Sequence, residues 1–173
     1  MGRSARRRTH EPSFSHRRPR FGYPIEVGVA VYTPGRPQIS VWSSLIKPAA
    51  TWLQTMSWHP IAARIHGIAR QELKNAPTAW DVAAQLNQLL APYGVAYCDG
   101  YRFDHRWLFL LMQECPETCA FELHDVSQLA RRLGVEPAAL FEHDNYPTAH
   151  RAGTDAKAFL CRTLAAHNKL QRP

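Results

Sequence analysis

Two neighbouring β-prone segments constrain the fold of this chain most. Residues 25–32 (IEVGVAVY) and 38–46 (QISVWSSLI) carry the alternation and the β-branched side chains of strands. Residues 33–37 (TPGRP) lie between them, and their proline and glycine content is typical of a turn. The two segments therefore predict an antiparallel hairpin that Pro48 ends. A chain with such a hairpin is not all-helical.

Helical and strand-like patterns alternate along the rest of the chain. Thr78 and Asp81 resemble a capping box at the start of an amphipathic helix. Gly67 and Gly134 stand where two other helices are expected to end. This order predicts an α/β fold with a mixed sheet flanked by helices. We expect helices at 59–65, 78–91, 105–114, 126–133 and 155–168, strands at 94–98 and 120–124, and a loop at 99–104.

Composition limits the class of protein. With 173 residues and 45% hydrophobic content, the chain is suited to one domain with a real core. No apolar run approaches the ~18–20 residues of a membrane span, and the N-terminus lacks the apolar stretch of a signal peptide. The four cysteines do not form a disulfide-like array and are expected to be free thiols. We therefore expect a cytoplasmic protein with no membrane partner.

The positive charge of the chain is concentrated at one end. Residues 1–20 hold seven arginines and one acid, Glu11, and so supply +6 of the formal net charge of +7. We expect residues 1–22 to be a disordered Arg-rich arm and residues 23–169 to form the folded domain. The arm is suited to phosphate contacts, but the favoured interpretation is an unstructured tail or a mis-assigned start of the reading frame.

Three polar side chains are expected to converge on one site. Asp104 follows a predicted buried strand, and functional groups gather at the carboxyl ends of strands in open α/β sheets. His150 and Asp155 stand at the start of the last predicted helix. Neighbouring carboxylates repel unless a cation binds between them. A pair of divalent ions held by carboxylates is a standard device for hydrolysing a phosphodiester, and a nearby histidine can take the proton from the attacking water.

Four segments in this order resemble the DEDDh 3′→5′ exonucleases, the family of RNase T and of the proofreading subunit of bacterial DNA polymerase. The resemblance covers roughly residues 24–168. The segments are PIEVGVA at 24–30, IHGI at 65–68 with EL at 72–73, DGYRFD at 99–104 and HRAGTD at 150–155. The resemblance implies a ribonuclease H-like fold and a metal-dependent 3′→5′ exonuclease that acts on single-stranded DNA or RNA 3′ ends.

The resemblance also assigns roles to individual residues. It implies that Asp104 and Asp155 are ligands of a two-metal site for Mg²⁺ or Mn²⁺, and that His150 is the general base. It places Asp99 where many members have asparagine. His66 and Gly67 fall in the segment that lies near the 3′ end of the substrate, so His66, Gly67 and Asp99 are expected to bind nucleic acid. Many members are dimers or subunits, which leaves a homodimer open for this chain.

One departure from the family concerns its first strand, which carries an Asp-x-Glu pair that holds both metals. Upstream of Pro24 the chain offers only Thr9-His-Glu11, so Glu11 stands for the glutamate and Thr9 replaces the aspartate. Residues 6–8 and Pro12 argue against a buried strand there. Glu26 is acidic but lies inside a predicted strand and is interpreted as structural. The first strand is therefore missing or degenerate, and the alternative is a non-catalytic nucleic-acid-binding pseudo-nuclease.

A helical metal phosphohydrolase with His-Asp pairs is a third class. The chain contains His124-Asp125 and His143-Asp144. That class is all-helical, and the predicted hairpin argues against it.

Overall fold

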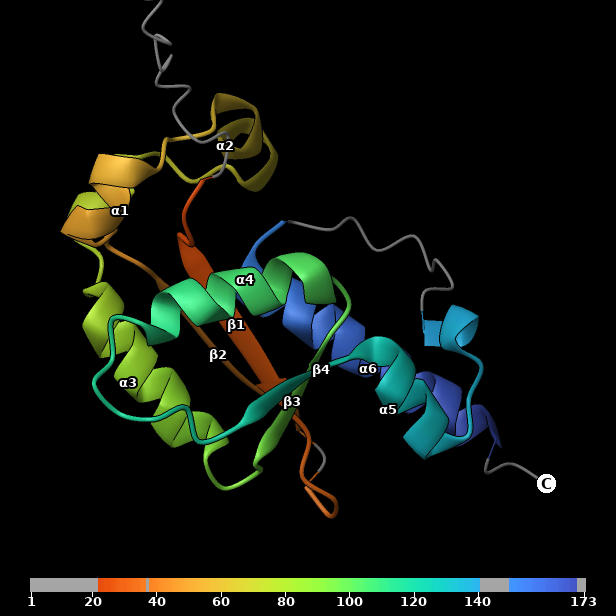
Figure 1. Ribbon diagram of the computed structural model, residues 1–173. Coiled ribbons are helices and arrows are strands. Elements are labelled where there is room, and N and C mark those ends of the chain that lie inside the picture. Colours follow the sequence, from red (N-terminus) through yellow and green to blue (C-terminus); the bar gives the residue numbers. More distant parts are fainter. Residues whose placement is uncertain (1–21, 37, 141–149, 171–173) are drawn as a thin grey trace, which may run out of the picture.

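The computed structural model describes residues 22–36, 38–140 and 150–170, and Figure 1 shows their arrangement. Glu11 and the pair His143-Asp144 lie outside the described residues. In chain order the elements are β1 Glu26–Val31, β2 Ser40–Leu45, α1 Ala50–Thr55, α2 Pro60–His66, η1 Glu72–Lys74, α3 Ala79–Leu90, β3 Val95–Cys98, α4 Tyr101–Met112, β4 Glu122–Asp125, α5 Val126–Leu133, η2 Pro137–Leu140 and α6 Ala152–Leu170.

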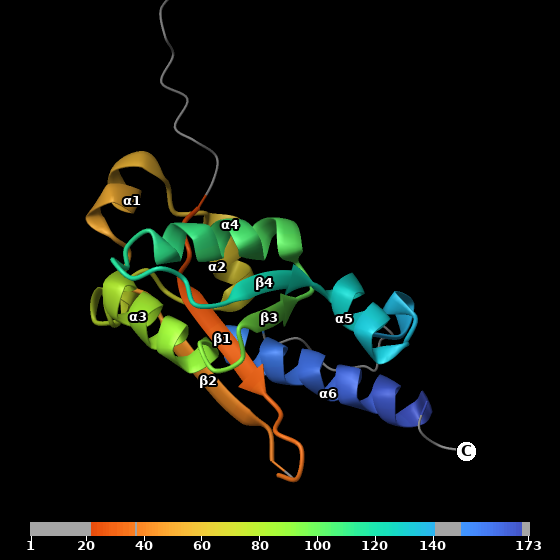
Figure 2. The same ribbon diagram turned by 60° about the horizontal axis from the view of Figure 1, so that its bottom comes forward.

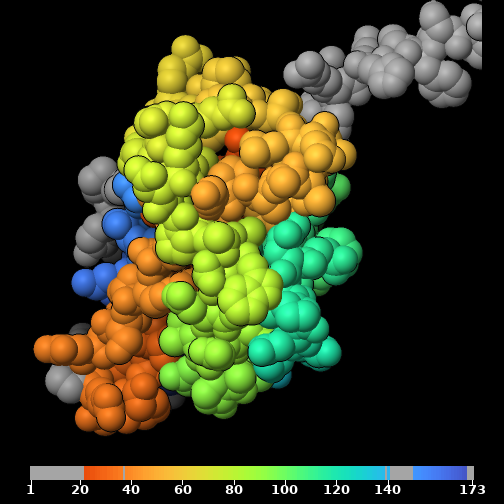
Figure 3. Space-filling model, turned by 90° about the vertical axis from the view of Figure 1, so that its left-hand side faces the viewer, coloured from red at the N-terminus to blue at the C-terminus, as the bar shows by residue number. Residues whose placement is uncertain are grey.

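The predicted hairpin is confirmed. β1 pairs antiparallel with β2, in a register that sets Glu26 opposite Leu45 and Val31 opposite Ser40. The outer end of this hairpin protrudes beyond the helices at the lower edge of the molecule in Figure 3, whereas α1 and α3 cover much of the rest of that face.

The expected single mixed sheet is a prediction that the structure corrects. β3 pairs in parallel with β4, and β1 with β2, but among the described residues no strand joins the two pairs. The fold is thus mixed α/β with one antiparallel and one parallel pair. β3 and β4 remain adjacent because α4 connects them as a crossover helix.

Local sequence signals place several helix ends. The capping box at Thr78 is present: the Thr78 Oγ1 accepts from the Asp81 N–H at 3.1 Å, and the Thr78 N–H donates to an Asp81 carboxylate oxygen at 3.3 Å. Gly67 and Gly134 end α2 and α5 in the left-handed conformation, at φ 67° and 68°. α4 begins at Tyr101, earlier than the expected 105, and Asp104 therefore lies in its first turn and not in a loop.

Helices lie on both sides of the parallel pair. Figure 2 shows α4 on one side of β3 and β4 and α6 on the other. The main core joins the hairpin to α1, α3 and α4, and its most deeply buried members include Ile46, Trp52, Val82 and Leu86. A smaller cluster joins α5, η2 and α6 through Val126, Ala130, Val135, Leu140 and Ala166. No described helix combines the length and apolar composition needed to cross a membrane.

Candidate active site

Three aspartates from separate parts of the chain line one large cavity beside the carboxyl end of β3. They are Asp99 directly after β3, Asp104 in the first turn of α4 and Asp155 in the first turn of α6. Because α4 starts immediately after β3, Asp104 points back toward the strand end. Asp104 and Asp155 therefore line the same cavity, and the charge of Asp99 acts on both of them.

Asp104 is held by two neighbours. It accepts a hydrogen bond from the Gly100 backbone N–H and interacts with the Cys98 thiol, which also lies 3.7 Å from the His124 carbonyl oxygen, and both neighbours lower the pKa of Asp104. Burial and the charge of Asp99 outweigh them, so the pKa of Asp104 is raised. Burial, followed by the charge and hydrogen bond of Asp104, raises the pKa of Cys98 to about 12, which keeps that thiol protonated as a donor. Asp104 is therefore well positioned and carries a desolvated charge.

Asp155 is a poorly compensated acidic group in the cavity. Its Oδ1 atom is buried and has no hydrogen-bond partner among the described residues. Burial raises the pKa of Asp155, and the charges of Asp99 and Glu26 raise it further, whereas His150 and Arg162 lower it. A buried carboxylate oxygen without a partner is costly, and a bound cation would remove that cost.

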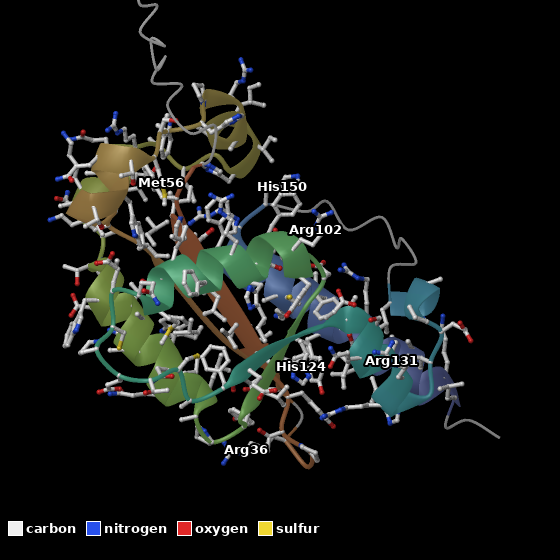
Figure 4. All side chains as sticks on the ribbon, viewed as in Figure 1. Arg36, Met56, Arg102, His124, Arg131 and His150 are labelled. Atoms are coloured by element: carbon white, nitrogen blue, oxygen red, sulfur yellow. The ribbon has the colours of Figure 1, made fainter. Side chains whose placement is uncertain are left out.

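His150 lies at the start of the last described segment. Its backbone has φ 47°, the only non-glycine residue with positive φ among those described. Figure 4 shows His150 and Arg102 near the end of the molecule where α4 and α6 begin. His150 is exposed, and its charge acts on Asp155. An imidazole in that position can exchange protons with solvent beside the aspartates.

The two residues expected from the IHGI segment differ in their positions. His66 lines the cavity, and its ring packs edge-on against Trp58 at 6.1 Å between centroids. Its Nδ1 accepts from the Ile68 N–H at 3.0 Å, and burial is the main cause of its lowered pKa. Gly67 is exposed, does not line the cavity, and its described role is to end α2.

A salt bridge that the sequence did not reveal fixes the start of α6. Arg151 donates to both carboxylate oxygens of Glu26, with the shortest distance 2.9 Å from Nη2 to Oε1. Glu26 also accepts from the Ala152 N–H at 2.9 Å, which places a negative charge at the N-terminus of α6. The Glu26 side chain is only 9% exposed. Its structural interpretation therefore holds, and this pair positions Asp155.

Two glycines allow α6 to lie directly on the hairpin. A Cβ at Gly28 would come 2.2 Å from the Ala152 carbonyl carbon, and one at Gly153 would come 2.9 Å from Ser43 Cβ. Neither glycine has positive φ, so close approach and not backbone conformation requires them. Gly153 lies inside the HRAGTD segment, but sequence alone did not show that its role is packing.

The residues suited to a metal are few. Within the described ranges no group of three or more His, Cys, Asp or Glu side chains has the geometry of a metal site. Asp99, Asp104 and Asp155 thus share a cavity without forming such a group. No family model, curated protein or solved structure matches this chain.

Proposed function

We propose that the protein is a divalent-metal-dependent 3′→5′ exonuclease that acts on single-stranded nucleic-acid ends. The observation that carries this proposal is that Asp104 and Asp155, from two different helices, line one cavity, and that the Oδ1 atom of Asp155 is buried without a described partner. Their order with His150 and the IHGI segment supports the same reaction class. The choice between DNA and RNA is left to experiment.

The two aspartates fit one Mg²⁺ or Mn²⁺ ion. Mg²⁺ is commonly held by one or two carboxylates, with water and substrate phosphate oxygens as its other ligands. Burial and the charge of Asp99 raise the pKa of both Asp104 and Asp155, so a cation bound in the cavity would offset both their desolvation and the repulsion from Asp99. Such an ion, when bound, would supply Lewis-acid polarisation of the phosphodiester and a water of lowered pKa.

The protein groups then have separate tasks. The Cys98 thiol and the Gly100 N–H fix one orientation of Asp104. The Glu26–Arg151 pair fixes the start of α6 and with it Asp155. His150 accepts the proton of the attacking water and returns it to solvent. His66, whose pKa is lowered, is neutral near pH 7 and offers an uncharged contact at the cavity wall.

A second candidate is nucleic-acid binding without hydrolysis. Among the described residues no three metal-ligating side chains form a group, and this favours the second candidate, since a two-metal site needs several carboxylates close together. The seven arginines of residues 1–20 supply charge for phosphate binding in either case.

Trimming of end-labelled oligonucleotides tests the proposal. Full-length chain is mixed with single-stranded DNA and RNA in Mg²⁺, Mn²⁺ or EDTA, with free and blocked 3′ ends. We expect metal-dependent shortening from the 3′ end, a loss of ~10² or more in Asp104→Asn, and a loss of ~10²–10⁴ in His150→Ala. Asp81→Asn makes the same chemical change on α3, outside the cavity, and should trim as the parent does.

The outcomes separate the two candidates. Retained oligonucleotide binding with no trimming in either metal would favour the non-catalytic protein. Trimming by Asp104→Asn at the rate of the parent would show that the site assignment is wrong.

A further inference from the structure

Two strand edges are open toward the same cavity. Among the described residues β1 pairs with no strand other than β2, and β3 with no strand other than β4. Each of the two strands therefore has a second edge whose backbone N–H and C=O groups have no strand partner. All residues of β1 and of β3 line the cavity that also reaches the aspartates. The open edges of two sheets thus border one space.

This space is lined by strands and by apolar side chains of helices, as the position of an inner strand of a sheet would be. Its volume is about 1370 Å³, larger than the ~300–1,000 Å³ of ordinary ligand pockets. Protein interiors are otherwise packed with few voids larger than a water molecule. Apolar side chains from helices of both layers face it: Leu86 and Leu90 from α3, Leu108 from α4, and Ala156, Phe159 and Leu160 from α6. We call this space the strand slot.

We propose that the strand slot binds an extended apolar peptide segment of another polypeptide, which adds a strand between β1 and β3. An extended backbone provides donors and acceptors along two edges at once, as in strand addition to a sheet. A strand with helices on both faces is apolar on both faces. The lengths of β1 and β3, six and four residues, set the length of the segment. Charged side chains are accommodated only beyond its ends.

The chain's own N-terminal residues are poorly suited to this role. Residues 1–21 contain seven arginines, and no two of their apolar side chains (Met1, Ala5, Phe14, Phe21) are adjacent. The acidic side chains of the slot stand at the start of β1 and beside the carboxyl end of β3, so an arginine between the middles of the two strands would bring a charge among apolar side chains, which is costly. A segment from a separate chain, rich in valine and isoleucine, has the chemistry that the walls require.

Hydrogen exchange of the full-length chain with a synthetic peptide tests the inference. The probe has six alternating valine and isoleucine residues, the length of β1, flanked by lysines for solubility. We expect saturating peptide to slow exchange of β1 and β3 amides together by about tenfold or more. The same peptide with a central proline lacks one N–H and should protect neither strand.

Variants of α6 provide matched controls. Ala156→Trp puts a large side chain into the slot and should abolish protection, whereas Ala165→Trp, on the exposed side of the same helix, should leave it unchanged. Asp104→Asn should bind the peptide as the parent does, because the inference does not depend on catalysis.

Several results would overturn the inference. Protection of β2 or β4 alone would mean addition at an outer edge, and equal protection by the proline peptide would mean non-specific binding. Slow amide exchange of β1 and β3 in the absence of peptide would mean that residues 1–21 fill the slot. Protection that rises with chain concentration, without peptide, would mean that a second copy fills it.

Discussion

Asp155 occupies a position that its described surroundings do not stabilise. Its Oδ1 atom is buried without a hydrogen-bond partner, and burial raises the pKa of the carboxyl. Asp104 is also desolvated but has the Cys98 thiol and the Gly100 N–H as donors. A charged group in the position of Asp155 lowers the stability of the metal-free chain and is retained when it serves function.

Asp155→Asn should therefore stabilise the chain in EDTA, by about 1 kcal/mol at pH 7. The folded-state pKa lies above the ordinary 3.8, so the folded chain holds this proton more tightly than the unfolded chain. The stability that protonation supplies is present below pH 3.8 and is lost as the pH rises through the folded-state pKa. Denaturant unfolding at pH 4 and pH 7 should show the larger gain at pH 7. A variant less stable than the parent at pH 7 would contradict this account.

The residues of the site divide according to whether the sequence carries a signal for them. Asp104 and Asp155 were predicted because an acid follows a buried strand and another opens a helix. The sequence carries no such signal for the Glu26–Arg151 pair, because the two residues are 125 positions apart and neither lies in a motif that predicts the other. Gly67 belongs to a segment of the resemblance, yet its described role is the end of α2.

At the scale of elements, the contact between β1 and α6 positions Asp155. Gly28 and Gly153 allow α6 to pack directly against the hairpin. The salt bridge between Arg151 and Glu26 joins the start of α6 to β1. The contact is a close approach of backbone to backbone, so it tolerates no added side-chain atom at Gly28.

Gly28→Ala should destabilise the chain by about 1–3 kcal/mol, because its Cβ would lie 2.2 Å from the Ala152 carbonyl carbon and the helix must move. Thermal unfolding measures the loss. Gly22→Ala is the matched control, since the nearest atom to its Cβ would be the Ser57 carbonyl oxygen at 3.8 Å. Equal melting temperatures for the two variants would contradict the packing role of Gly28.

The sequence predicted the existence of elements better than their pairing. Alternation and turn residues were sufficient to predict the hairpin. The Thr78 capping box predicted the start of α3, and Gly134 predicted the end of α5. The predicted start of α4 was wrong because residues 99–104, which contain Gly100 and two aspartates, were interpreted as a loop. The described residues form two strand pairs and not the predicted single mixed sheet, because a period of two shows that a segment is a strand but not which edge it uses.

At the scale of the whole molecule, the two strand pairs border a space at whose end the aspartates stand. The described chain brings Asp99, Asp104 and Asp155 to this space from α4 and α6 and from the end of β3. A strand added to the slot would cover the apolar walls and reduce the water around the aspartates, which strengthens their interaction with a cation. The proposed hydrolysis and the proposed strand addition are nevertheless separable by the Asp104→Asn variant.

The most direct test of the central claim is a Mn²⁺ titration of the full-length chain, followed by electron paramagnetic resonance. If Asp104 and Asp155 hold a cation, the parent should bind about one Mn²⁺ per chain. Asp104→Asn and Asp155→Asn should each weaken binding by about tenfold or more, and Asp81→Asn should bind as the parent does. A parent that binds no Mn²⁺, or affinity equal in all four proteins, would contradict the assignment of these two aspartates as a metal site.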